Sequence, residues 1–78
     1  MLCSKEQLEE IRLLSQFNLT STATGGIKVH AGEASPELVA AAKRLFDKGL
    51  TDHTDGGYLT SRGVEAAEHA QSLLRLLA

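Results

Sequence analysis

The side chains best suited to catalysis or metal binding are few in this chain, and their spacing matches no familiar type of site. Apart from the acids, the metal-binding residue types are scattered as Cys3, His30, His53 and His69, whereas metal-ligand pairs are separated by only about two to four residues. Asp52 and Asp55 lie close together, but a calcium loop needs further oxygen ligands and a closing glutamate. No serine or threonine has a base and an orienting group at a recognisable spacing. We therefore predict no metal, no cofactor and no enzymatic activity.

Basic side chains offer a second kind of chemistry, which is contact with the phosphates of nucleic acid. Three of the eight Lys and Arg residues fall on the outward face of an expected helix, beside Ala40 and Ala41, whose small size would let that helix approach a DNA groove closely. An ordinary solvated helix surface has the same pattern. The net charge of −2 argues against a strongly basic DNA-binding domain but does not exclude local phosphate contacts. The candidate nucleic-acid-binding residues are Lys43, Arg44, Lys48 and Arg62.

The elements that would position these residues begin with three helices, each with a recognisable start. Ser4 and Gln7 have the spacing of a capping box. Ser35 followed by Pro36 gives a capping residue and a proline at the first helical position, and Thr60 can cap a third helix. The expected helices run from Lys5 to about Phe17, from Pro36 to about Lys48 and from about Ser61 to Leu77.

Between the last two helices, residues 44–63 predict a helix end, a hairpin and a new helix start. Gly49 is the residue type that most easily adopts the left-handed conformation that ends a helix. Asp55-Gly56-Gly57 offers the positive φ angles that two-residue hairpin turns require. The flanking segments at residues 50–53 and 58–59 are the expected paired strands.

A further strand is expected before the second helix. Ile27-Lys28-Val29-His30 alternates apolar and polar residues as a short half-buried strand does, and it follows a polar loop at residues 20–26. It would add a third strand to the hairpin, which would be marginally stable alone. The 78 residues have room for one domain. The expected fold is a single α+β domain over residues 1–78, in the order α-β-α-β-β-α.

Residues 36–63 resemble the second half of a winged helix-turn-helix domain. In such repressors a recognition helix ends in Leu-x-x-x-Gly-Leu, a hairpin wing follows, and a new helix starts at Leu-Thr-x-x-Gly. The matching residues are Leu45, Gly49, Leu50, Leu59, Thr60 and Gly63. The resemblance implies a small winged-helix-like domain whose helix from Pro36 to Lys48 faces duplex DNA. The helix that should precede a recognition helix is either missing or degenerate in residues 25–34. Winged-helix modules that bind proteins show the same pattern.

Most of the chain also resembles a largely uncharacterised family of short bacterial proteins of similar length, whose members are often labelled DNA-binding. The similar stretches are residues 13–17, 26–30, 41–50 and 55–60. Two functions therefore stay open. The first is a small regulatory protein that binds DNA as a dimer, and the second is a protein-interaction module on the same scaffold that does not bind DNA. The acids Asp52 and Asp55 on the expected wing favour the second, whereas the basic residues named above favour the first.

The first and last expected helices contain more apolar side chains than so small a chain can bury, since chains of this size bury only about 60% of their unfolded surface. We therefore expect a homodimer formed by these terminal helices. The expected interface residues are Leu13, Phe17, Leu73, Leu74 and Leu77.

The start of the sequence and its single cysteine predict a soluble, cytoplasmic protein with no membrane partner. Residues 1–6 lack the apolar run of a signal peptide. Nowhere do about 18 apolar residues follow one another, as a membrane-spanning helix requires. Cys3 has no second cysteine with which to form a disulfide, which is typical of a reducing compartment.

Overall fold

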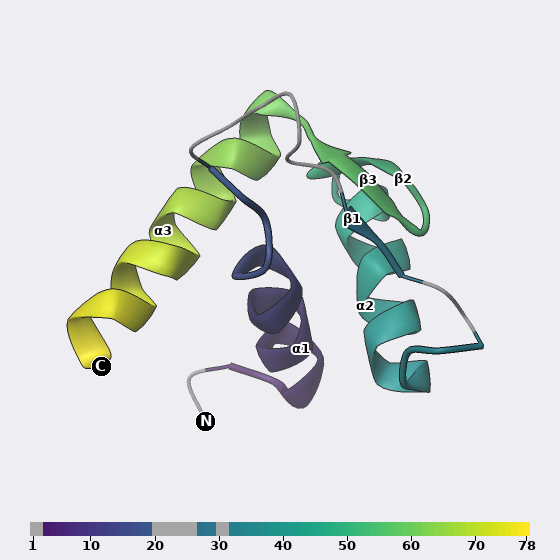
Figure 1. Cartoon of the computed structure of the whole chain (residues 1–78), viewed down its shortest axis with the longest axis horizontal. Helices are drawn as coiled ribbons and strands as arrows, with labels where there is room; N and C mark the ends of the chain where they lie inside the picture. The colour runs from purple at the N-terminus through teal and green to yellow at the C-terminus, as the bar shows by residue number, and fades with distance from the viewer. Residues whose placement is uncertain (1–2, 20–26, 30–31) are drawn as a thin grey trace.

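The computed structural model shows three helices packed with a small antiparallel sheet (Figure 1). It describes residues 3–19, 27–29 and 32–78. The helices are α1 (Lys5–Leu14), α2 (Pro36–Asp47) and α3 (Ser61–Leu77), and the strands are β1 (Ile27–Lys28), β2 (Thr51–His53) and β3 (Gly56–Leu59). The expected α+β class and element order are therefore confirmed. The polar loop expected at residues 20–26, and the end of the expected strand at His30, lie outside the described residues.

Each helix begins where its capping residues predict. The Gln7 N–H donates to Ser4 Oγ at 3.1 Å and the Ser4 N–H donates to Gln7 Oε1 at 2.8 Å, which completes the capping box of α1. Ser35 Oγ accepts the N–H of Leu38 at 3.3 Å at the start of α2. These bonds satisfy donors that a helix N-terminus would otherwise leave without a partner.

The first helix is shorter than expected, because it ends at Leu14 rather than near Phe17. The Ser15 hydroxyl donates to the carbonyl of Arg12 at 2.6 Å, and the Gln16 N–H donates to the carbonyl of Leu13 at 3.0 Å. The chain therefore turns, and it buries Phe17 to 2% exposure.

The end of α2 has the expected glycine cap. Gly49 has a φ of +78°. Its N–H donates to the carbonyl of Phe46 at 2.9 Å, and the N–H of Leu50 donates to the carbonyl of Leu45, also at 2.9 Å. These two bonds form a complete Schellman motif. The motif reverses the chain directly into β2.

The sheet has the order β1-β3-β2, so β1 adds the expected third strand, paired antiparallel with β3. The hairpin turn, however, is at Thr54 and Asp55, and the expected turn centred on Asp55-Gly56-Gly57 is wrong. Gly56 and Gly57 instead begin β3, with φ angles of +120° and +74°. The register shifts between the pairs Thr51–Leu59 and His53–Gly56, which places a bulge in β3.

The core lies around α1, which packs between α2 and α3 (Figure 1). On α2 the buried face differs from the expected one: Ala41, expected on the outward face, is fully buried, whereas Phe46 is 38% exposed. The physical reason is that α2 is covered by α1 on one side and by β2 and β3 on another. The buried core residues are Leu13, Leu14, Phe17, Ala41, Ala42, Leu45, Ala67 and Ala70.

A side chain of α3 holds the end of α1. Gln71 Nε2 donates to the carbonyl of Leu14 at 3.1 Å and to the carbonyl of Phe17 at 2.8 Å. These carbonyls lie beyond the last helical bonds of α1, where they need an external donor. Gln71 therefore links α3 directly to the end of α1.

Candidate functional site

Two of the candidate DNA-binding cations hold α1 against α2. Arg44 Nε donates to Glu10 Oε2 at 3.0 Å, and Lys48 Nζ donates to Glu10 Oε1. Arg44 Nη2 also donates to the carbonyl of Glu6 at 3.2 Å. The Glu10 side chain is only 8% exposed. Arg44 and Lys48 therefore act first as partners of a buried carboxylate.

The protonation of Glu10 follows from this arrangement. Burial raises the pKa of Glu10, but hydrogen bonds from Lys48 and Arg44, together with their charges, lower it by more, so the net pKa lies below the ordinary value for a glutamate. The carboxylate is therefore ionised at neutral pH and offsets positive charge from both neighbours. Sequence reasoning missed this residue, although a signal was present: Glu10 precedes Leu13, Leu14 and Phe17 at helical spacing on the apolar stripe of α1.

The other two candidate cations lie at the surface. Lys43 Nζ and Asp47 Oδ2 form an exposed ion pair at 3.2 Å, one helical turn apart on α2. Arg62 is exposed in the first turn of α3. Among the residues that the structure describes, no acidic side chain forms a salt bridge with Arg62. The four candidates thus do not form one continuous basic surface.

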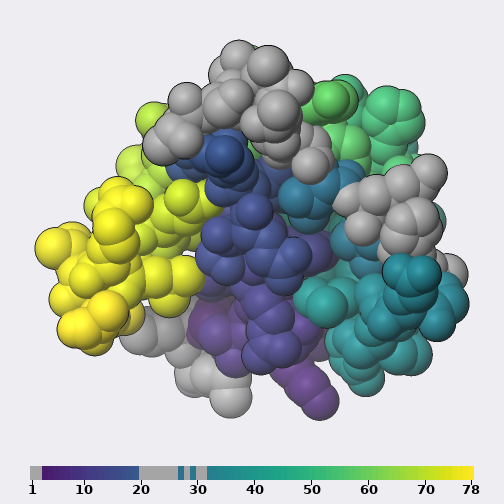
Figure 2. All heavy atoms as spheres, in the orientation of Figure 1, coloured from purple at the N-terminus to yellow at the C-terminus, as the bar shows by residue number. Residues whose placement is uncertain are grey.

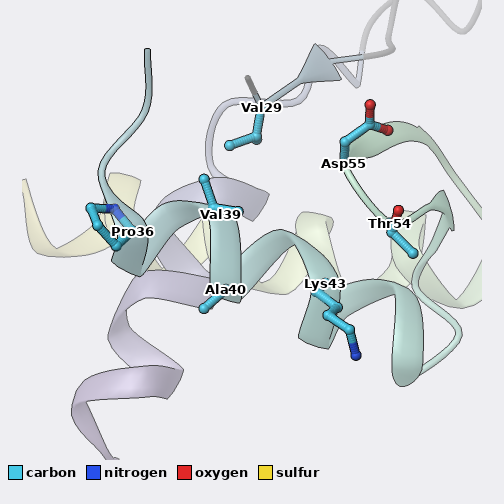
Figure 3. Close-up of a pocket in the computed structure, with 7 residues that line it drawn as sticks. All are labelled: Val29, Pro36, Val39, Ala40, Lys43, Thr54 and Asp55. Carbon is cyan, nitrogen blue, oxygen red and sulfur yellow. The ribbon is translucent and has the colours of Figure 1, made fainter. Parts of the chain in front are cut away.

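The outward face of α2, which was expected to enter a DNA groove, is one wall of a groove of about 640 Å³ (Figure 3). Ala40 and Lys43 lie on this wall, and the hairpin turn with Val29 forms the other. Figure 3 shows Val29 across the groove from Val39, while the Lys43 side chain points away from the hairpin turn. The residues that line this α2–hairpin groove are Val29, Pro36, Val39, Ala40, Lys43, Thr54 and Asp55.

The lining of the α2–hairpin groove suits apolar groups better than phosphates. Val29, Pro36, Val39 and Ala40 are four of its seven described lining residues, and its volume lies within the range of about 300–1,000 Å³ that is typical of ligand-binding clefts. Among the described residues of the lining, Lys43 is the only cation, and Asp55 is an acid. Sequence reasoning did not find this groove, because it depends on how the hairpin turn folds over α2.

The β2–β3 hairpin carries negative charge close to this groove. Asp52 Oδ1 accepts the N–H of Tyr58 at 2.8 Å and lies 2.7 Å from His53 Nδ1. The backbone bond from Tyr58, followed by the bond with His53, lowers the pKa of Asp52 below its ordinary value. Asp52 is therefore firmly ionised at neutral pH.

The residues expected in a dimer interface fall into two groups. Leu13 and Phe17 are buried within the single chain, at 1% and 2% exposure, so they belong to its own core and are not available at the surface. Leu73, Leu74 and Leu77 are exposed by 52%, 42% and 74%. Any contact with a second copy would therefore involve α3 rather than the buried face of α1.

Metal clusters and membrane-spanning helices are both absent from the residues that the structure describes. Within residues 3–19, 27–29 and 32–78, no three His, Cys, Asp or Glu side chains come together as a metal-binding cluster. In the same ranges no helix is both long enough and apolar enough to span a bilayer.

Comparison with known proteins gives a family without an assigned function. The chain belongs to a family of unknown function, DUF5669, whose model matches residues 1–78. No curated protein and no solved structure matches the chain.

Proposed function

We propose that this chain is a non-enzymatic protein-interaction module on a winged-helix-like scaffold, and that it binds a partner protein in the α2–hairpin groove. The observation that supports this most is the chemistry of the outward face of α2. Val39 and Ala40 line the groove together with Val29, on the face where phosphate contacts would be needed. The partner is expected to insert apolar side chains, because this groove offers apolar surface and few hydrogen-bonding groups.

The charges around the groove support the same proposal. Arg44 and Lys48 are bound to Glu10, and Lys43 is paired with Asp47. Contact with phosphates would require these cations to leave their carboxylates, and breaking the Glu10 contacts would leave a buried charge without partners. The ionised Asp52 on the wing would repel a nucleic-acid strand at short range.

Site-specific photo-crosslinking in cells tests the proposal. A photoreactive amino acid at Ala40, which is exposed in the groove, is expected to give a discrete adduct with a protein. The same group at Glu65, exposed on α3, is the matched control and should give no such adduct. Adding Val39→Asp should reduce the yield at Ala40 at least tenfold. Crosslinking to nucleic acid at Ala40, or equal protein adducts at both positions, would overturn the proposal.

Duplex DNA is the second candidate, and two observations favour it. A helix followed by a hairpin and then by a new helix is the arrangement that the winged-helix resemblance implies. Arg62 is exposed at the N-terminus of α3, where backbone N–H groups also favour phosphate. In this candidate Lys43, Arg44 and Lys48 contact phosphates. About four such contacts would give a slope of log affinity against log salt of about −3 to −4.

A further inference from the structure

A second hollow adjoins the α2–hairpin groove on the other side of α2. It has a volume of about 310 Å³ and lies between α1 and α2. Pro36 and Ala40 line this hollow and the α2–hairpin groove alike, and both residues are exposed. Figure 3 shows them on α2, where they are about one helical turn apart. Because neither side chain is long, a bound segment can cross α2 here from one hollow to the other.

The chemistry of the second hollow, which we call the acidic cleft, differs from that of the groove. Its described lining adds three acids and two bases to the two shared residues: Glu6, Glu9, Glu37, Lys5 and Arg44. Arg44 already donates to Glu10 Oε2 and to the carbonyl of Glu6. The side chains of Glu6 and Glu37 form no salt bridge with any residue that the structure describes. The acidic cleft therefore offers carboxylate acceptors directly beside an apolar groove.

Glu9 is the acid of the cleft whose position the helix starts do not explain. Glu6 and Glu37 lie in the first turns of α1 and α2, where the helix dipole favours a carboxylate. Glu9 lies further along α1, and its side chain is only 15% exposed. Its salt-bridge partner among the described residues is Arg12, whose Nη1 is 4.0 Å from Glu9 Oε2, too far for a hydrogen bond. A cation inside the cleft would give Glu9 the short charge-assisted bond that Arg12 does not give.

We propose that the partner protein of the α2–hairpin groove binds through a segment that carries a lysine or arginine beside its apolar side chains, and that this cation enters the acidic cleft. The inference rests on the proposed function and adds the charge of the partner to it. The apolar side chains of the segment contact Val39, its backbone crosses α2 over Ala40, and its cation lies against Glu9 and Glu37. Complementary charges of this kind select partners, because a segment with an acid at the same place meets like charge.

Selection from a library of random short peptides displayed on phage, with the purified full chain as the target, tests this charge preference. Lysine and arginine are expected to be enriched in the selected apolar peptides by about threefold or more over the library. Glu37→Lys in the target should remove this enrichment. The matched control is Glu65→Lys, which makes the same change of charge at an exposed position of α3 and should keep the enrichment.

The affinity of one selected peptide, measured by fluorescence anisotropy, gives the second readout. Glu37→Lys should weaken its binding by about tenfold, and Glu9→Gln, which keeps the size of the side chain but not its charge, by about fivefold. Glu65→Lys should leave the affinity unchanged. Circular dichroism checks that each variant keeps its helices, which is expected of Glu37→Lys because Glu37 is exposed.

The outcomes separate this inference from the proposed function. Selected peptides that are apolar but not enriched in lysine or arginine would overturn the inference and leave the proposed function standing. Equal affinities of a selected peptide for the Glu37→Lys and Glu65→Lys variants would overturn it as well. So would a selection that enriches no peptide, whereas the proposed function is decided by the crosslink at Ala40.

Discussion

At the scale of single residues, Gly63 allows the start of α3 to pack directly against the backbone of Leu50. A Cβ at this position would overlap the carbonyl oxygen of Leu50 and would lie 3.0 Å from Leu59 Cδ2. The same carbonyl accepts the N–H of Thr60 at 3.0 Å, and the Thr60 hydroxyl donates to the carbonyl of Gly49 at 2.6 Å. Thr60 Oγ1 also accepts the Gly63 N–H at 3.1 Å. The end of α2 and the start of α3 are therefore joined at one point that has no room for a side chain.

Gly63→Ala is expected to lower the free energy of unfolding by about 1–3 kcal/mol, because the new methyl group must push the Leu50 carbonyl away. Denaturant unfolding measures this change. The control is Gly32→Ala, where a Cβ would meet no heavy atom within 4 Å, so its effect should stay within about 0.5 kcal/mol. Equal effects of the two substitutions would contradict the packing described at Gly63.

Glu10 is the second residue whose environment leads to a testable prediction, which concerns the pH dependence of the free energy of unfolding. Its folded-state pKa is lowered, so its stabilisation is fully present above the unfolded-state pKa of about 4.3 and is lost as the pH falls through the folded-state pKa. Glu10→Gln should therefore lower the free energy of unfolding at pH 7, by about 1–2 kcal/mol, since Arg44 and Lys48 are partly exposed and solvent screens the pairs.

The test of Glu10 is a series of denaturant unfolding curves from pH 7 downward. The difference between the wild-type chain and Glu10→Gln should shrink once the pH is below about 4.3. Glu65→Gln, at an exposed position of α3, serves as the control and should show little difference at any pH. A Glu10→Gln deficit that is the same at pH 7 and at low pH would show that the charge of Glu10 does not stabilise the fold.

At the scale of elements, the sequence predicts the helix starts, which depend on hydrogen bonds between residues close in the chain. It does not predict the hairpin turn or the buried face of α2, which depend on contacts between more distant residues. The three helix starts were predictable because a capping residue and its target lie three positions apart, as in Ser4 and Gln7. The hairpin turn was misplaced because the Asp52 side chain reaches the N–H of Tyr58 across the hairpin, and turn propensities do not include this bond. The burial of Ala41 depends on two other elements packing on α2, and local periodicity cannot show this.

The contact between α1 and α3 gives the prediction at this scale. Gln71→Glu replaces the amide donor with a carboxylate that faces the carbonyls of Leu14 and Phe17. The free energy of unfolding should fall by about 2 kcal/mol, because two buried acceptors lose their donor. Amide hydrogen exchange in α1 should become faster at the same time. Glu68→Gln, an exposed position on α3, is the control and should change neither quantity. Unchanged exchange in α1 of the Gln71→Glu variant would contradict the role given to Gln71.

At the scale of the whole molecule, the chain presents two surfaces of different kinds. The α2–hairpin groove lies between α2 and the β2–β3 turn. Four exposed leucines, Leu73, Leu74, Leu76 and Leu77, lie at the C-terminal end of α3, which projects on another part of the molecule (Figure 2). The sequence predicted that α2 and α3 would present functional surfaces. It could not predict that Glu10 would bind two of the candidate cations, Arg44 and Lys48, because these contacts join residues 34 and 38 positions apart.

The central claim is that α2 presents its outward face to a protein and not to DNA, and a titration with duplex DNA tests it most directly. Fluorescence anisotropy of a labelled random-sequence duplex would be followed at about 50 mM salt, where non-specific DNA binders are expected to bind at micromolar concentrations or below. The account predicts no binding by the folded chain up to about 10 µM. Binding that weakens with salt at a slope of about −3 to −4, and that disappears when Lys43 and Arg44 are both replaced by alanine, would contradict it.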